Sequence, residues 1–153
     1  MASATKSKVC FFFKSPVSLQ DRTKLKKFIE GIFRKEKKKL RTLNYIFCSD
    51  KDLLEINRQY LKHDYYTDII TFELSDKGTP VEGEIYISVD RVKENAGSLG
   101  EPFYKELLRV IFHGTLHLCG YKDKGKMEIR KMREEETKIL SEYFRVPRDT
   151  VSC

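Results

Sequence analysis

The sequence has few of the features that mark membrane, exported or fibrous proteins. Its longest uninterrupted apolar run near the N-terminus, Val9–Phe13, is far shorter than the roughly 20 residues of a membrane span. The same run is too short for the apolar region of a secretory signal, so we expect no export. With 4 prolines and 8 glycines among 153 residues, the chain is neither collagen-like nor of low complexity. Its 40% of hydrophobic residues suffice for one globular domain.

Cysteines are also sparse and scattered. The four of them stand far apart without a CxxC pair: Cys10, Cys48, Cys119 and Cys153. This spacing argues against a disulfide framework and against a cysteine-rich zinc knuckle, and it suits free thiols in a reducing compartment. We therefore expect a cytoplasmic protein without disulfides and without a membrane segment.

Positive charge, by contrast, is concentrated in one segment. Residues 22–41 contain ten Lys or Arg and two acidic residues, whereas the remaining 20 basic and 21 acidic residues nearly cancel. Apolar residues at helical spacing, from Leu25 to Phe33, predict an amphipathic helix with Ser18 as its N-cap and the lysines facing outward. Such a face fits a polyanion-binding surface and a merely solvated helix equally well. In the first case Lys35 and Lys38 would contact the backbone of a nucleic acid.

The order of predicted elements is β-α-β-α-β-β-α-α-α, which indicates an α+β fold: a small mixed four-stranded sheet packed with about five helices. Strands are expected at 8–14, 41–48, 69–74 and 84–88, the last two antiparallel. Helices are expected within 22–41 and at 51–60, 89–96, 103–119 and 126–143, with 61–67 irregular. We expect a single domain at 8–145, with flexible tails at 1–7 and 146–153.

The apolar helix at 103–119 carries the strongest chemical signal, the phrase His113-Gly-Thr-Leu-His117. At about 100° per residue, four steps return the second imidazole to within about 40° of the first, one turn further on. Both can then bind one metal ion. Gly120 ends the helix, so that Asp123 can turn back as a third ligand and leave a fourth position open for water.

Interpretations without a metal ion also stay open for these two histidines. A histidine on an apolar helix is often a core residue hydrogen-bonded to a carbonyl, and HxxxH pairs also arise by chance. The phrase also lacks the glutamate that follows the first histidine in HExxH metalloproteases, where it acts as the general base. Gly114 has no side chain to replace it, so a plain protease is disfavoured.

The stretch from His113 to Asp123, HGTLHLCGYKD, resembles the signature HGxLHLxGYDH of the YbeY family of metal-dependent endoribonucleases. Upstream segments are similar to that family's NxxYRxxDxxTDVLSF and GDI patterns, in order and at fitting distances. They are Asn57-Arg-Gln-Tyr60 with Asp64, Thr67-Asp68-Ile-Ile-Thr-Phe72 and Gly83-Glu84-Ile85. The resemblance covers roughly residues 9–143, nearly the whole chain.

This resemblance implies a zinc-dependent endoribonuclease that cuts single-stranded RNA in ribosomal RNA processing, including small-subunit maturation, and in ribosome quality control. It implies one ion per chain, held by His113, His117 and Asp123, which would act through that ion and its water. The expected partners are ribosomal RNA and ribosome-associated proteins. Two alternatives stay open: an RNA- or ribosome-binding module with a structural metal, and a metal-dependent hydrolase of another substrate such as a peptide.

The sequence departs from the family pattern at two functional positions. Asp123 stands where the family has its third metal histidine, after Lys122 in place of an aspartate. A carboxylate is an acceptable zinc ligand, but the harder oxygen could favour other divalent ions. Leu61 stands where the family usually has a substrate-contacting arginine. We expect a nearby cation to replace it, from among Arg58, Lys62 and His63. Lys122 and Lys124 either hold phosphate beside the ion or are solvated residues of the turn.

Overall fold

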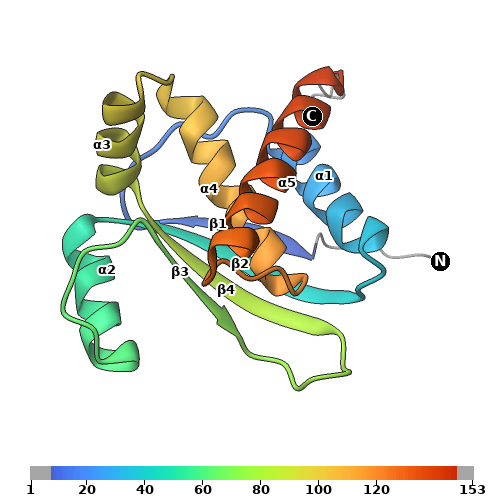
Figure 1. Ribbon diagram of the computed structural model, residues 1–153, viewed down its shortest axis with the longest axis horizontal. Helices are drawn as coiled ribbons and strands as arrows, with labels where there is room; N and C mark the ends of the chain where they lie inside the picture. Colours follow the sequence, from blue (N-terminus) through green and yellow to red (C-terminus); the bar gives the residue numbers. More distant parts are fainter. Residues whose placement is uncertain (1–7, 148–153) are drawn as a thin grey trace.

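A mixed four-stranded sheet forms the centre of the computed structural model, which describes residues 8–147 (Figure 1). The strands lie in the order β1-β2-β4-β3, with bounds β1 Val9–Phe13, β2 Leu40–Cys48, β3 Ile69–Glu73 and β4 Val81–Ser88. β2 pairs in parallel with both β1 and β4, whereas β3 runs antiparallel to β4. The predicted α+β fold with a small mixed sheet is confirmed.

Within the described part of the chain, five α-helices pack around this sheet, as the sequence predicts. They are α1 Arg22–Lys35, α2 Asp50–Ile56, α3 Val89–Leu99, α4 Phe103–Leu118 and α5 Lys126–Arg145, and α2 continues into a π-helical turn, η1 Asn57–Leu61. Helices α1, α4 and α5 cover one face of the sheet, and α2 lies toward the other (Figure 1). Among the helices of residues 8–147, none combines the length and the hydrophobicity that a membrane-spanning helix needs.

Three local predictions are corrected. Helix α1 begins after Asp21, not after Ser18, because buried Leu19 keeps the preceding segment packed on the core in a non-helical conformation. It ends at Lys35, so Lys38 lies in the turn to β2 and not on the helix face; Lys37 has a φ of 59°, which stops the helix. Strand β4 begins at Val81, three residues early, because Val81 pairs with Leu40 of β2.

Some predictions concern residues that the structure does not describe. Residues 1–7 and 148–153, which make up most of the two predicted tails, lie outside the described residues, as does Cys153. Among the described residues, Cys10, Cys48 and Cys119 are free thiols. The domain bounds 8–145 stay a prediction.

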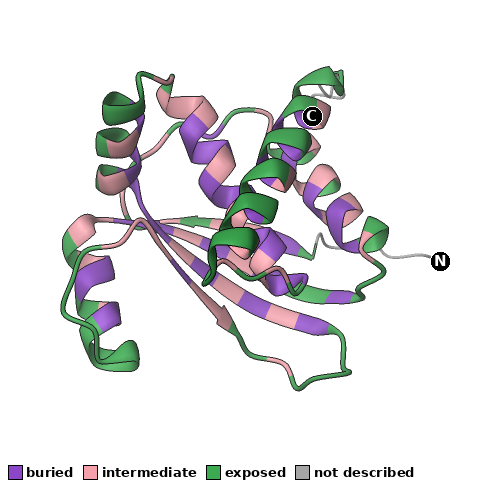
Figure 2. Cartoon of the chain, viewed as in Figure 1, coloured by how far each residue is buried: buried purple, intermediate pink, exposed green. Residues whose placement is uncertain are grey.

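Helix α4 is the central helix and brings the candidate site onto the sheet. Leu107, Leu108, Ile111 and Phe112 are fully buried, and Figure 2 shows burial along much of this helix, whereas α5 has a broad exposed outer face. The alternation of β2 places Tyr45 on the covered face, where its hydroxyl hydrogen-bonds that of Thr115 at 2.5 Å. This hydrogen bond, together with the contacts of α4 with β3 and β4, fixes the position of the two histidines relative to the sheet.

Gly114 allows α4 to lie this close to the sheet. A Cβ at this position would lie 2.8 Å from Ile69 Cδ1 and 2.9 Å from Ile85 Cδ1, both closer than carbon atoms approach. We expect Gly114→Val to lower the free energy of unfolding by about 1 to 3 kcal/mol, because the extra atoms overpack the helix–sheet interface. Urea unfolding measures this loss.

Gly31 in α1 provides the matched control, because a Cβ there meets nothing within 4 Å. Gly31→Val is expected to change stability by no more than about 0.5 kcal/mol, since valine is a slightly better helix former than glycine. Equal unfolding midpoints for the two variants would show that Gly114 is not a contact point between α4 and the sheet.

Candidate metal centre

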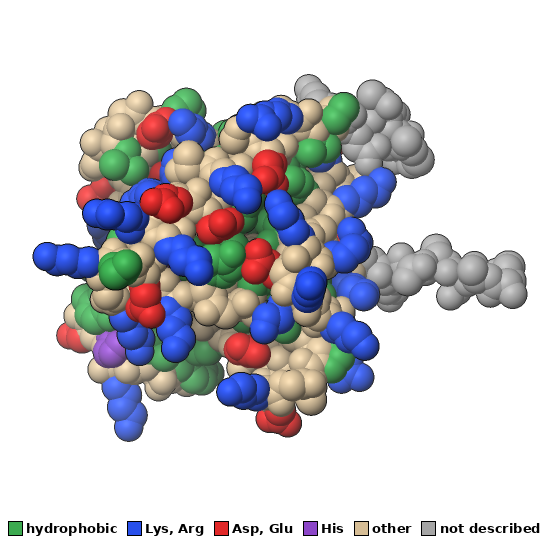
Figure 3. Space-filling view, turned by 45° about the vertical axis from the view of Figure 1, so that its right-hand side comes forward, with side chains coloured by type: hydrophobic (Ala, Val, Ile, Leu, Met, Phe, Trp, Pro, Cys, Tyr) green, Lys and Arg blue, Asp and Glu red, His purple; other side chains and the backbone are tan. Residues whose placement is uncertain are grey.

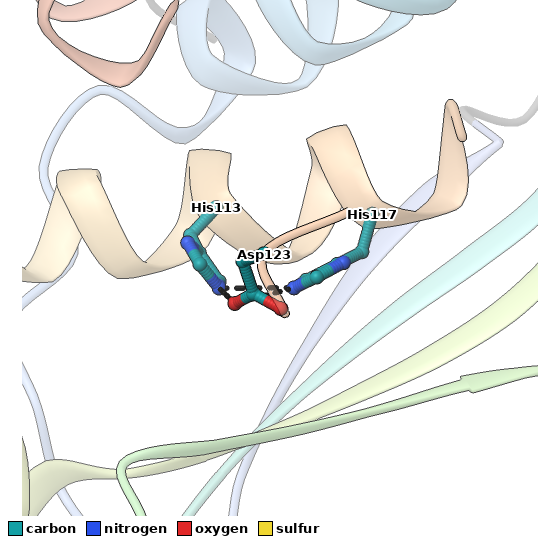
Figure 4. A group of neighbouring side chains, drawn as sticks. All are labelled: His113, His117 and Asp123. Carbon is teal, nitrogen blue, oxygen red and sulfur yellow. Dashed lines mark hydrogen bonds and ion pairs between the residues drawn. The ribbon is translucent and has the colours of Figure 1, made fainter. Parts of the chain in front are cut away.

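The last two turns of α4 and the turn that follows bring three ligand-type side chains together. His113 and His117 are one turn apart on α4, and their Nε2 atoms are 3.0 Å from each other. The chain reverses at Gly120, whose φ of 105° lies in the left-handed region that glycine tolerates. Asp123 then turns back, so that its Oδ2 is 3.2 Å from both Nε2 atoms (Figure 4).

Each imidazole is oriented by a hydrogen bond at its other nitrogen. His117 Nδ1 donates to the backbone carbonyl of Tyr121 at 2.9 Å, and His113 Nδ1 donates to Glu136 Oε2 at 2.5 Å. Because both acceptors fix the proton on Nδ1, both Nε2 lone pairs face Asp123. A metal-ligating histidine is oriented in the same way in known sites.

The donor set fits a divalent cation. Two imidazole nitrogens and one carboxylate oxygen are all acceptors when deprotonated, and they repel one another unless a cation lies between them. Ligands at about 2.0 to 2.1 Å from a tetrahedral zinc are about 3.3 to 3.4 Å apart, close to the spacings seen here. Within residues 8–147, His113, His117 and Asp123 form the one group of three such side chains with ligand atoms inside 4.8 Å.

Buried charges lie directly behind the first imidazole. Glu136 is 4% exposed, and Arg109 is 3.5 Å from its Oε1 and 3.7 Å from Glu106 Oε1. Burial alone would lower the pKa of His113, but the hydrogen bond and charge of Glu136, together with the charge of Asp123, outweigh it and raise that pKa. The unfavourable protonation of a buried imidazole is thus offset by the surrounding carboxylates.

A polar cavity of about 330 Å³ opens beside these groups. Its lining includes His113, Asp123, Arg109, Arg133 and Asp68. Burial raises the pKa of the Asp68 carboxyl, whose Oδ2 accepts a hydrogen bond from Asn95 Nδ2 at 3.3 Å. The cavity is large enough for a phosphate group and offers both a cation site and guanidinium groups.

The predicted substrate-contacting residues lie in three other places. Arg58 pairs with Asp64, and the His63 ring stacks on that of Tyr65 with their centroids 5.1 Å apart. Arg58, Lys62 and His63 do not line the 330 Å³ cavity. Lys122 and Lys124 flank Asp123 in the turn after α4. Lys35 pairs with Glu142 at 3.5 Å, and Lys38 lies in the turn between α1 and β2.

Sequence reasoning missed Glu136 and Arg109. One signal was available for Glu136: it falls on the buried stripe of α5 formed by Met132, Ile139 and Tyr143, where a charged residue is unusual. Spacing alone gave no sign of its partner, since Glu136 is 23 residues from His113. No local pattern signalled Arg109.

The chain is similar to known proteins over most of its length. The family model for endoribonuclease YbeY matches residues 14–144. The endoribonuclease YbeY of Cytophaga hutchinsonii is 48% identical over 138 residues, 89% of this chain and 96% of that protein. That of Flavobacterium psychrophilum is 42% identical over 132 residues, 86% and 94% of the two chains.

A solved structure is also similar over nearly the whole chain. The solution structure of TM1509 from Thermotoga maritima gives a TM-score of 0.63 at 29% identity, covering 95% of this chain and 99% of that one. Fold, motif and sequence identity therefore agree over the same residues, and the resemblance noted in the motifs is confirmed. The chain belongs to the endoribonuclease YbeY family.

Proposed function

We propose that this protein is a metal-dependent endoribonuclease that cuts single-stranded RNA during ribosomal RNA processing in the cytoplasm, including maturation of the small-subunit RNA and ribosome quality control. The observation that carries the proposal is the convergence of His113 Nε2, His117 Nε2 and Asp123 Oδ2 on one point beside a polar cavity. Membership of a family whose members are named endoribonucleases supports the reaction type.

Zinc is the proposed ion, with one per chain. Two neutral imidazoles and one carboxylate are a ligand set that zinc uses in catalytic sites, where a fourth position stays open. When bound by these three residues, a divalent ion would supply Lewis-acid chemistry for the hydrolysis of a phosphodiester. Because one ligand is an oxygen, manganese and cobalt are the alternatives to test first.

The chain's own residues would supply the remaining functions. Lys122 and Lys124 lie on either side of Asp123, where their ammonium groups can hold the phosphate next to the cleaved bond. The exposed rings of Tyr65 and His63 offer a surface on which unpaired bases can stack. Near them, Arg58 and Lys62 would take over the role of the arginine that Leu61 replaces.

Lysines also line a second hollow, of about 880 Å³, beyond the C-terminal end of α4. Lys37, Lys38 and Lys39 come from the turn after α1, and Lys77 from the β3–β4 hairpin. Within residues 8–147, none of these four is paired with an acidic side chain. Figure 3 shows Lys and Arg side chains along the right-hand edge of the described surface, with few acidic ones among them.

We expect a triple variant, in which glutamine replaces Lys37, Lys38 and Lys77, to bind single-stranded RNA more weakly and with less dependence on salt. Each lost phosphate contact reduces the slope of log K against log salt concentration by about 0.7, so the three together reduce it by about 2. Fluorescence anisotropy with a labelled RNA at several salt concentrations measures the slope. The control replaces three exposed lysines elsewhere, Lys51, Lys93 and Lys138, with glutamine; an equal slope for both triple variants would contradict the assignment.

The function itself is tested by a cleavage assay. Purified protein is expected to cut a labelled single-stranded RNA internally, to leave the matching duplex intact, to lose activity with a chelator and to regain it when zinc is added. Cleavage that persists after the chelator has removed all bound metal would exclude the proposed mechanism.

An RNA-binding module with a structural ion is the second candidate, because the same three ligands tie the turn at 119–125 to α4. This alternative predicts that the metal-loaded protein binds single-stranded RNA tightly and leaves it intact. The cleavage assay therefore separates the two functions directly. A peptide substrate is disfavoured, since Gly114 stands where HExxH proteases carry their general base.

A further inference from the structure

We infer that Glu136 is a positioning residue of the metal centre: its carboxylate holds His113 in the tautomer and orientation that present Nε2 to the ion. The inference rests on the proposed function, because it concerns the same site. The inference adds to the proposed function a residue of another helix, which acts through His113 and is not itself one of the three ligands.

Glu136 lies where a carboxylate without partners would destabilise the fold. Its side chain is buried and lies on the inner face of α5, among Met132, Ile139 and Leu140. A buried carboxylate is strongly destabilising without charged or hydrogen-bonding partners. Glu136 has these partners on both of its oxygen atoms, so the location of the charge is specified by the surrounding residues.

The two oxygens of Glu136 have separate partners. Oε2 accepts the hydrogen bond from His113 Nδ1, and Oε1 lies 3.5 Å from Arg109 Nη1 and 3.8 Å from Arg133 Nη1. Arg109 precedes His113 by one turn on α4, so both side chains reach α5 from the same side of the helix. Arg109 is 14% exposed, whereas Arg133 is 62% exposed, which makes Arg109 the principal charge partner.

This arrangement makes the two imidazoles chemically different. His117 donates to a neutral backbone carbonyl, whereas His113 donates to a carboxylate. A carboxylate partner makes the opposite nitrogen a more basic ligand and restricts rotation of the ring.

The test measures metal affinity in Glu136→Gln and in Glu134→Gln. Glu134 lies on the same helix but is exposed, so its variant makes the same charge change without touching His113. Competition with a chromophoric chelator is expected to show zinc affinity about 10 to 100 times weaker in Glu136→Gln, and unchanged in Glu134→Gln. Equal affinities in the two variants would overturn the inference while leaving metal-dependent cleavage by the wild type unaffected.

A second measurement uses the unaltered protein, so the result does not depend on whether the variant folds. Long-range proton–nitrogen NMR spectra of the imidazoles report which ring nitrogen carries the proton. We expect His113 to keep its proton on Nδ1 after zinc is added, with Nε2 as the ligand. A proton on Nε2 of His113 in the zinc-loaded protein would overturn the inference. If the wild type binds no metal at all, both the inference and the proposed function fail.

Discussion

Replacing His117 with alanine is expected to reduce RNA cleavage to background and to weaken zinc binding by more than about 100-fold. The loss should exceed the 10- to 100-fold effect of changing an outer hydrogen-bond partner, because a ligand itself is removed. Only His113 and Asp123 would remain, and the hydrogen bond from His117 to the Tyr121 carbonyl, which holds the turn against α4, would also be lost. Both quantities can be measured on the same purified sample, by metal competition and by cleavage of a labelled RNA.

The fold should survive this change, since the His117 side chain is 26% exposed and lies at the edge of the core. Met127→Ala is the control, because Met127 lies near the site in sequence but is 86% exposed. Its cleavage rate and metal affinity should equal those of the wild type. If His117→Ala cleaved RNA as fast as Met127→Ala, the triad would have no catalytic role.

Replacing Phe112 with alanine is expected to give the largest loss of stability, about 3 to 5 kcal/mol. Phe112 is fully buried next to His113, and its ring lies 5.4 Å from that of Phe28 in α1 and 5.7 Å from that of Tyr143 in α5. The three rings join the helices that cover the sheet. Their loss would leave a cavity where α1, α4 and α5 meet.

A loss of this size is a large fraction of the roughly 5 to 15 kcal/mol that stabilises a typical domain. Urea unfolding followed by circular dichroism measures it. Phe144 gives the matched control on the same helix as Tyr143, because its ring is 52% exposed. Phe144→Ala should lower stability by less than about 1 kcal/mol. Similar midpoints for the two alanine variants would contradict the central position of Phe112.

Local features of the fold were predictable because they depend on neighbours in the sequence. The apolar spacing from Leu25 to Phe33 predicted α1, and the continuous apolar pattern around Leu107 and Phe112 predicted a buried α4. Where prediction failed, contacts between distant segments had prevailed over local signals. Val81 belongs to β4 because it pairs with Leu40. Ser18 does not cap α1 because Leu19 packs in the core, and the helix begins only after Asp21.

The candidate site divides along the same line. His113, His117 and Asp123 lie within 11 residues, on one helix and the turn after it, so helical periodicity and the glycine at position 120 are enough to bring them together. The assignment of Arg58, Lys62 and His63 to RNA stays a prediction, because it depends on how a substrate lies across the surface. Their exposed positions are compatible with it.

The sequence by itself determined the family motif, the order of the elements and the three side chains that can hold an ion. The tertiary structure alone decided the strand order and the position of the lysines next to the hollow beyond α4. It also decided that Glu136, from the last helix, meets His113 across the interface of α4 and α5. The physical reason is one of range: turns and helical periodicity act over a few residues, whereas buried charge pairs and strand neighbours depend on how the whole core packs.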